Sequence, residues 1–261
     1  MAEPFTLGPV LVTGGTGEIG LGIARAFLER GARVAVIGTR AERVHAARAS
    51  LAAFDERVLA LAADLRTAAE VRRAIEAVES RFGTTAVLVN CAGLNFNLAI
   101  DEVTEDDYDR LLAINVKSAF FASQLAGRRM AASGIAGRIV NITSGNYRYA
   151  RPNAALYSAS KAALEMLTRS FALELGAAGI TVNAVAPGLV ARAGAPPPEF
   201  ARIADYYIAN SPLGRLVRPE DVATAVAFLA SAEASGITGE TIVVDGGFSA
   251  GRYDFPRRSQ R

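Results

Sequence analysis

Residues 10–20 have the sequence VLVTGGTGEIG, in which an apolar segment ends at a cluster of glycines. Segment 10–13 predicts a short buried strand, and the helical spacing of apolar residues over 19–30 predicts a helix after it. Glycines at such a junction let the backbone turn tightly and let a pyrophosphate approach the free N–H groups of the helix start. Gly15, Gly17 and Gly20 match the spacing of a dinucleotide-binding loop. The alternative is a structural turn, but the position between strand and helix favours nucleotide binding.

The alternation of short apolar segments and longer helical segments continues along the chain. Strands are expected at 10–13, 33–37, 58–62, 86–90, 137–142, 181–186 and 241–244, and helices at 19–30, 41–53, 67–82, 104–133, 155–175 and 219–230. Such alternation builds a parallel sheet with helices on both faces. We therefore expect an α/β fold: a single doubly wound Rossmann domain over residues 1–261 with a seven-stranded parallel sheet.

Two zones lack this pattern. Zone 187–218 contains three consecutive prolines and is expected to be an irregular substrate lid. The C-terminal tail 249–261 is expected to be solvated or to contact another subunit.

The composition limits the possible functions. The chain has 261 residues, a formal net charge of +2 and a mean hydropathy of +0.23. A single Cys excludes an intramolecular disulfide and, with a single His, argues against a metal site. The small, dispersed charge gives no electrostatic case for nucleic acid. No apolar run reaches about 18 residues, and no signal-peptide pattern is present, so we expect no membrane partner and a cytoplasmic location.

The end of the second predicted strand bears on the choice of cofactor. An acidic residue there would hold the free 2′-hydroxyl of NAD, whereas this chain has Thr39 and Arg40. A hydroxyl and a guanidinium suit a 2′-phosphate, so we predict NADP and regard NAD as the less favoured cofactor. The alternative is that Arg40 is a solvated residue at a helix start. Because Glu18 would repel a phosphate, we expect its side chain to point away from the cofactor.

Tyr157 and Lys161 lie four positions apart at the start of a strongly helical segment, which places them on one helix face. An ammonium beside a phenol favours the phenolate, so Tyr157 is a candidate acid/base near neutral pH. Such a pair is common by chance, but Ser144 follows the fifth predicted strand and Asn115 lies in the long helix before it. Because the carboxyl ends of parallel strands share the edge where ligands bind, we expect Ser144, Tyr157 and Lys161 to meet there.

With these motifs together, the chain resembles the short-chain dehydrogenase/reductase superfamily, in its single-domain branch, over residues 8–248. It is similar to 3-oxoacyl-thioester reductases and to many alcohol dehydrogenases of that branch. The resemblance implies a catalytic set of Asn115, Ser144, Tyr157 and Lys161. It implies cofactor binding by Gly14, Thr16, Gly17, Ile19, Thr39, Arg40, Asp64, Leu65, Asn90, Ala92, Tyr157, Lys161, Pro187 and Val190.

Four positions depart from the family pattern. Glu18 stands where the usual loop has Gly, and Gly17 stands where NADP-dependent relatives often have a basic residue. Cys91 replaces the second Asn of an Asn-Asn-Ala-Gly motif, and we expect it to be a small buried residue rather than a nucleophile. Arg192 lies near the position of a Thr that contacts the cofactor carboxamide. The sequence leaves three possible partners for its guanidinium: a cofactor phosphate, an acidic substrate or solvent.

The resemblance implies hydride transfer between nicotinamide and a carbonyl or carbinol carbon. Tyr157 would transfer the proton and Ser144 would position the substrate oxygen. Lys161 would hold the nicotinamide ribose, and Asn115 would support a water that passes protons to solvent. We expect the substrate pocket to be lined by Asn95, Asn146 and Tyr147.

These observations predict an NADP(H)-dependent reductase of a 3-oxoacyl thioester or a related small ketone. Arg148 and Arg151 are candidates for contact with a carrier- or CoA-linked substrate, or are solvated. The alternatives are an NAD-dependent alcohol dehydrogenase acting in the oxidising direction and a non-catalytic nucleotide-binding regulatory protein. The helical segments 104–133 and 155–175 are expected to pair across a two-fold axis, giving a homo-oligomer, a dimer or a tetramer.

Overall fold

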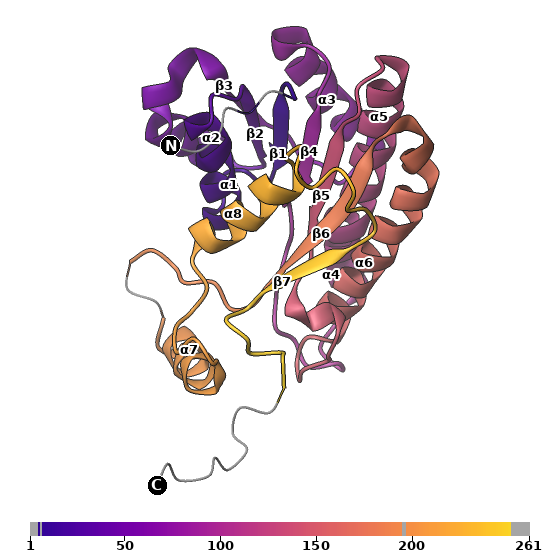
Figure 1. Ribbon diagram of the computed structural model, residues 1–261. Helices are drawn as coiled ribbons and strands as arrows, with labels where there is room; N and C mark the ends of the chain where they lie inside the picture. Colours follow the sequence, from indigo (N-terminus) through magenta and orange to yellow (C-terminus); the bar gives the residue numbers. More distant parts are fainter. Residues whose placement is uncertain (1–4, 6, 195–196, 252–261) are drawn as a thin grey trace, which may run out of the picture.

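The computed structural model describes residue 5 and residues 7–194 and 197–251. Its centre is one sheet of seven parallel strands in the order β3-β2-β1-β4-β5-β6-β7 (Figure 1). The strands are β1 (Val10–Thr13), β2 (Val34–Gly38), β3 (Val58–Ala62), β4 (Val87–Asn90), β5 (Arg138–Ile142), β6 (Thr181–Pro187) and β7 (Thr241–Val244). Each begins and ends within one residue of the prediction. The doubly wound α/β fold is confirmed.

Helices cover both faces of the sheet (Figure 1). They are α1 (Glu18–Glu29), α2 (Ala41–Ser50), α3 (Ala68–Phe82), α4 (Glu105–Leu112), α5 (Ser118–Ala132), α6 (Ala155–Leu175), α7 (Pro198–Asn210) and α8 (Pro219–Leu229). Alternate strand residues point to opposite faces. Val12 of β1 accordingly joins an apolar cluster with Phe27 of α1 and Val226 of α8. Leu11 joins a second cluster with Met130 of α5. Both faces of the sheet are thereby buried.

The strand order reverses between β1 and β4. From this point β2 and β3 extend toward one edge of the sheet, and β5 to β7 extend toward the other. The loops after β1 and β4 therefore flank a crevice. Thr13 and Asn90 are register partners there, and Thr13 Oγ1 accepts from the N–H groups of Cys91 and Ala92 at 3.1 and 3.2 Å. This hydroxyl ties the two loops together where they begin.

The expectation of an irregular segment over 187–218 is wrong for its centre, which forms α7. Pro198 is the first residue of α7, a position where the fixed φ of proline suits the helix and its missing N–H has no intrahelical partner to lose. Pro197 and Pro198, two of the prolines that suggested a loop, therefore lie at the start of a helix. The predicted helical segment 104–133 is helical without a break from α4 to α5, which are joined by a π-helical turn, Ala113–Lys117.

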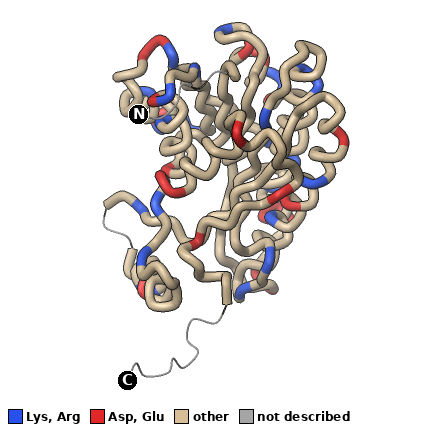
Figure 2. The backbone as a smooth tube through the Cα atoms, in the orientation of Figure 1, with Lys and Arg blue, Asp and Glu red and all other residues tan. Residues whose placement is uncertain are grey.

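Basic and acidic residues are interspersed along the backbone (Figure 2). None of the helices in the described part of the chain is long and apolar enough to span a membrane. Of the predicted tail, residues 249–251 are described, and 252–261 lie outside the described residues.

Candidate active site

The glycine loop between β1 and α1 depends on the absence of side chains. Gly14 has a φ of +65°, and a Cβ there would lie 2.7 Å from the backbone of Ala92. A Cβ at Gly20 would collide with the Gly14 carbonyl oxygen. Gly17 precedes α1 and makes no side-chain cap, so the first N–H groups of the helix remain available to an anion. The loop therefore fits the pyrophosphate that its sequence predicted.

A cleft of about 880 Å³ opens above this loop at the carboxyl edge of the sheet. Its walls come from the ends of β2, β3, β4 and β6 and from the lid. Ten of the predicted cofactor residues line it: Gly14, Thr16, Gly17, Ile19, Thr39, Arg40, Asp64, Leu65, Ala92 and Val190. Asn90, Tyr157, Lys161 and Pro187 are not among its lining residues. The Asn90 side chain is instead buried and donates to Ser123 Oγ and Asn141 Oδ1.

Guanidinium groups gather at the adenosine end of the cleft. Arg40 is joined there by Arg43 and Arg66, which sequence reasoning missed. Arg66 forms a two-pronged pair with Asp64, with its Nε and Nη2 at 2.8 and 2.6 Å from Oδ2. The hydrogen bonds from Arg66 hold the pKa of Asp64 below its usual range. Arg40 is the residue that precedes α2, and Arg43 lies in the first turn of this helix.

The Lys161 side chain lies close to the Tyr157 ring and to the end of the strand that precedes Ser144. Its Nζ is buried, donates to the Ile142 carbonyl at 2.9 Å and lies 5.8 Å from the centre of the Tyr157 ring. Ile142 ends β5, two residues before Ser144. A Cβ on Gly93, which lines the cleft, would lie 3.5 Å from the same Nζ. The ammonium thus sits among α6, the end of β5 and the wall of the cleft.

Asn115 lies in the π-helical turn and is fully buried. Its Oδ1 accepts from the Leu94 N–H at 2.7 Å, and its Nδ2 donates to the Leu94 carbonyl at 3.0 Å. Nδ2 also donates to Ser160 Oγ at 3.0 Å, and Ser160 Oγ donates to the Tyr157 carbonyl at 2.7 Å. Asn115 therefore clamps the loop after β4 to α6 beside Tyr157. Ser160 had no signal in the sequence, since serine is common on helices.

The predicted substrate residues lie in different surroundings. Asn95 lines the cleft. Asn146 is 7% exposed, and its Nδ2 has no partner among the described residues; its N–H donates to Ser144 Oγ at 3.3 Å. Tyr147 is half-buried, and burial raises the pKa of its phenol. Asn146 is therefore a donor without an acceptor, placed beside Ser144.

Cys91 lines the cleft and is half-buried, so it is less enclosed than expected. Loss of solvent around the thiol raises the pKa of Cys91 to about 11. The thiol therefore stays protonated at neutral pH, and this geometry gives it no nucleophilic role.

The segment predicted as a lid contributes side chains and backbone to the wall of the cleft, at Gly188, Leu189, Val190, Arg192 and Phe200. Glu18 Oε1 accepts from the Ala193 N–H at 2.9 Å, so one oxygen of this carboxylate is directed to the lid. The Arg192 guanidinium lies 4.7 Å from the centre of the Phe200 ring. Two of the sequence departures, Glu18 and Arg192, thus meet where the lid passes the glycine loop.

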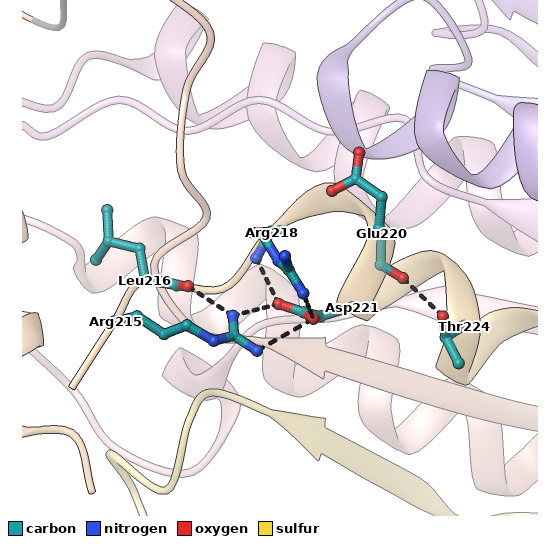
Figure 3. A network of polar contacts seen from close by, with 6 residues as sticks. All are labelled: Arg215, Leu216, Arg218, Glu220, Asp221 and Thr224. Carbon is teal, nitrogen blue, oxygen red and sulfur yellow. Dashed lines mark hydrogen bonds and ion pairs between the residues drawn. The ribbon is translucent and has the colours of Figure 1, made fainter. Parts of the chain in front are cut away.

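The far end of the lid is fixed at the start of α8 (Figure 3). Asp221 accepts from Arg215 Nη1 at 2.6 Å and from the Arg218 N–H at 2.8 Å. The Arg215 guanidinium is the main cause that holds the pKa of Asp221 well below its usual range. A bridge between Val190 and Val217 joins the two ends of the lid.

Aromatic rings attach α7 to the rest of the site. Tyr207 stacks on Phe248 with ring centres 4.2 Å apart, and Tyr149 lies 6.5 Å from Phe248. Burial is the main cause that raises the pKa of Tyr149. These contacts join α7 to the segment after β5 and to the segment after β7.

Comparisons with known proteins agree with this geometry. A family model described as enoyl-(acyl carrier protein) reductase matches residues 15–249. The chain is 38% identical to a 3alpha-hydroxysteroid dehydrogenase of Mediterraneibacter gnavus, over 90% of this chain and 94% of that protein. It is 39% identical to a sorbitol dehydrogenase of Cereibacter sphaeroides, over 91% of this chain and 95% of that protein.

A solved structure described as a short-chain alcohol dehydrogenase of Sinorhizobium meliloti 1021 superposes with a TM-score of 0.89 at 35% identity. The match covers 95% of this chain and 98% of that one. The fold and the site define an oxidoreductase that binds a dinucleotide. The chain belongs to the short-chain dehydrogenase/reductase superfamily, whose members use NAD(P)(H).

Proposed function

We propose that the chain transfers a hydride between a nicotinamide dinucleotide and the carbonyl or carbinol carbon of a small ketone or secondary alcohol. The observation that supports this most is the position of Lys161. Its ammonium lies beside the Tyr157 ring, donates to the end of β5 next to Ser144, and adjoins the cleft at Gly93. The dinucleotide, when bound, supplies the hydride donor or acceptor.

The contacts of each side chain support a role. Tyr157 Oη exchanges the proton with the substrate oxygen, and the Lys161 ammonium lies beside the phenol ring. Ser144 Oγ accepts from the Asn146 N–H and keeps its own proton to donate to the substrate oxygen. Lys161 retains further donors for ribose hydroxyls. Asn115 is a positioning residue that fixes the cleft wall against α6.

The unpartnered Asn146 Nδ2 supports a substrate contact. A buried amide without an acceptor costs free energy, and a substrate oxygen beside Ser144 would supply that acceptor. We place Asn95 and Tyr147 in the same pocket, Asn95 because it lines the cleft.

We propose NADP(H) as the cofactor. Arg40 and Arg43 line the adenosine end of the cleft, and charge-assisted hydrogen bonds from guanidinium groups suit a 2′-phosphate. The carboxylates nearby are engaged: Asp64 with Arg66, and Glu42 at 3.8 Å from Arg40. An NAD-dependent enzyme would need a free carboxylate at this end.

The proposed substrate is a ring-bearing or sugar-alcohol-sized secondary alcohol and its ketone, as the names of the hydroxysteroid and sorbitol dehydrogenases suggest. A 3-oxoacyl thioester is the second candidate, favoured by the description of the family model. Two observations argue against a contact of Arg148 or Arg151 with a carrier- or CoA-linked substrate. Arg151 donates to Asn97 Oδ1 at 2.7 Å, and Arg148 lines a separate cavity of about 640 Å³ beside β7.

An absorbance assay of reduced nicotinamide oxidation tests this function. NADPH and NADH are each tried with neutral cyclic ketones, with the keto forms of sugar alcohols and with an acetoacetyl thioester. We expect NADPH-dependent turnover of at least one ketone that is not a thioester. Dinucleotide binding without turnover of any compound would instead support the non-catalytic alternative.

We also propose a homodimer or homotetramer that forms through α6. Met166 and Leu173 on this helix are 58% and 86% exposed, and apolar side chains of this size favour burial against a second copy. Light scattering of the purified protein should give a dimer or tetramer mass. A monomer at micromolar concentration would contradict the proposal.

A further inference from the structure

Two guanidinium groups face the cleft, each beside a phenylalanine ring. Arg192, between β6 and α7, lies 4.7 Å from the centre of the Phe200 ring. Arg110 of α4 lies 5.7 Å from the centre of the Phe96 ring, in the loop after β4. Arg192, Phe200 and Arg110 all line the cleft of about 880 Å³. The two pairs come from different walls, one from the lid and one from α4 and the loop beside it.

The charge of Arg192 has no counter-ion among the residues that the structure describes. Within the described part of the chain, Arg192 takes part in no ion pair. Glu18 adjoins this part of the lid, but its Oε1 already accepts from Ala193. Arg110 lies 4.0 Å from Asp107 Oδ1, the limit of an ion pair, and Asp107 also caps α4 through Thr104. Both guanidinium groups can accept an anionic partner.

A guanidinium stacked on a ring uses its face for the ring and keeps the N–H donors at its edge. Those donors form a planar fork that matches a carboxylate. Phe96 and Phe200 offer apolar surface beside the two forks. The phosphates of the dinucleotide would have other donors, because the glycine loop would hold the pyrophosphate, and Arg40 and Arg43 would hold a 2′-phosphate.

We infer that the substrate carries a carboxylate on a compact apolar ring, which Arg192 and Arg110 bind while Phe96 and Phe200 flank the ring. This inference rests on the proposed function and names its substrate class. It gives Arg192, which lies near the position where many relatives have a Thr, a role in substrate specificity.

Isothermal titration with two matched probes tests the inference. The probes are a cyclohexanone with a carboxylate opposite the ketone and the corresponding carboxamide, which has nearly the same shape. Each is titrated into protein saturated with oxidised dinucleotide, which cannot reduce the ketone. We expect the carboxylate to bind at least about tenfold more tightly than the carboxamide, as charge-assisted hydrogen bonds predict.

The variants assign the preference to residues. Arg192→Gln and Arg110→Gln should each reduce the preference for the carboxylate and leave the Kd of the dinucleotide within about twofold. Arg202→Gln is the matched control, because Arg202 lies on α7, is exposed and does not line the cleft. Equal binding of the two probes, including no measurable binding of either, would overturn the inference.

A second result would also overturn it. If Arg192→Gln weakens dinucleotide binding and keeps the carboxylate preference, Arg192 serves the cofactor. The proposed function is judged separately by turnover of neutral ketones, and it can hold when the carboxylate preference is absent.

Discussion

Glu18 and Ala193 lie 175 positions apart in the sequence, and a hydrogen bond of 2.9 Å joins the Glu18 Oε1 to the Ala193 N–H. Glu18 is the first residue of α1, directly after the glycine loop, and Ala193 lies in the lid. The bond connects the phosphate side of the cleft to the segment that covers it. Glycine, the usual residue of the family at this position, has no side chain that could form this bond.

Removal of this bond should loosen the lid. We expect Glu18→Ala to increase tryptic cleavage after Arg192 by about fivefold, because one hydrogen bond contributes about 1 kcal/mol to local opening. Glu18→Gln keeps an acceptor oxygen and should be cleaved at nearly the rate of the unchanged protein. Limited proteolysis measures both rates, and equal cleavage of all three proteins would show that the bond does not hold the lid.

Arg43 should contribute to discrimination between the two dinucleotides. Replacement by Ala should raise the Kd of NADPH about tenfold, through loss of a charge-assisted hydrogen bond, and leave the Kd of NADH unchanged. Arg72→Ala on α3 is a control, since Arg72 is exposed and does not line the cleft. Fluorescence titration measures both constants. An equal loss of affinity for NADH would contradict the prediction, because Arg43 would then contact a group that NADH and NADPH have in common.

The three hydrogen bonds of the Asn115 side chain should contribute to both stability and turnover. Asn115→Ala leaves the Leu94 N–H and carbonyl without partners and should lower the free energy of unfolding by about 2–4 kcal/mol. It should also lower kcat, because the cleft wall is no longer fixed against α6. Ser160→Ala removes the bond from Asn115 and the bond to the Tyr157 carbonyl. It keeps both bonds between Asn115 and Leu94 and should therefore cost less. Urea unfolding and initial rates check these values, and equal effects of the two variants would contradict the ranking.

The features that could be predicted from the sequence are those that depend on the residues of a short segment. The glycine spacing at 14–20 and the apolar stripe with Ile23 and Phe27 placed the loop and α1, because backbone sterics and helical period act over a few residues. Residues that act through distant contacts gave no such signal. Ser160 acquires its role only when Asn115 approaches it from 45 positions away. Arg66 acquires its role at the adenosine end of the cleft once β3 lies beside β2.

The same distinction explains the errors in the lid. The prolines around 196–198 suit both a loop and a helix start, and the contact of Tyr207 with Phe248 favours the helix. The role of Glu18 was also hidden, because its partner is a backbone N–H of the lid.

Asp221 should make stability depend on pH. Its pKa in the folded protein is held well below the usual range, chiefly by Arg215, whereas in the unfolded chain it should be about 3.9. The ion-pair network therefore stabilises the fold at every pH above about 4 and loses this contribution as the pH falls toward the folded pKa. We expect Asp221→Asn to lower the free energy of unfolding by about 1 kcal/mol at neutral pH.

The difference between Asp221→Asn and the unchanged protein should shrink in acid. Urea unfolding at neutral pH and at about pH 3 checks this, since only the first condition lies above the unfolded pKa. A difference that stays constant between the two would mean that the loss does not come from the charge of Asp221.

The central claim is that the Tyr157 phenol exchanges the proton of the reaction. Tyr157→Phe removes one oxygen and keeps the ring beside Lys161. The most direct measurement combines the turnover of this variant with its Kd for NADPH. Turnover should fall by at least about a hundredfold, the usual contribution of a general acid or base, while the Kd for NADPH changes by less than about threefold. Turnover equal to that of the unchanged protein would contradict the account.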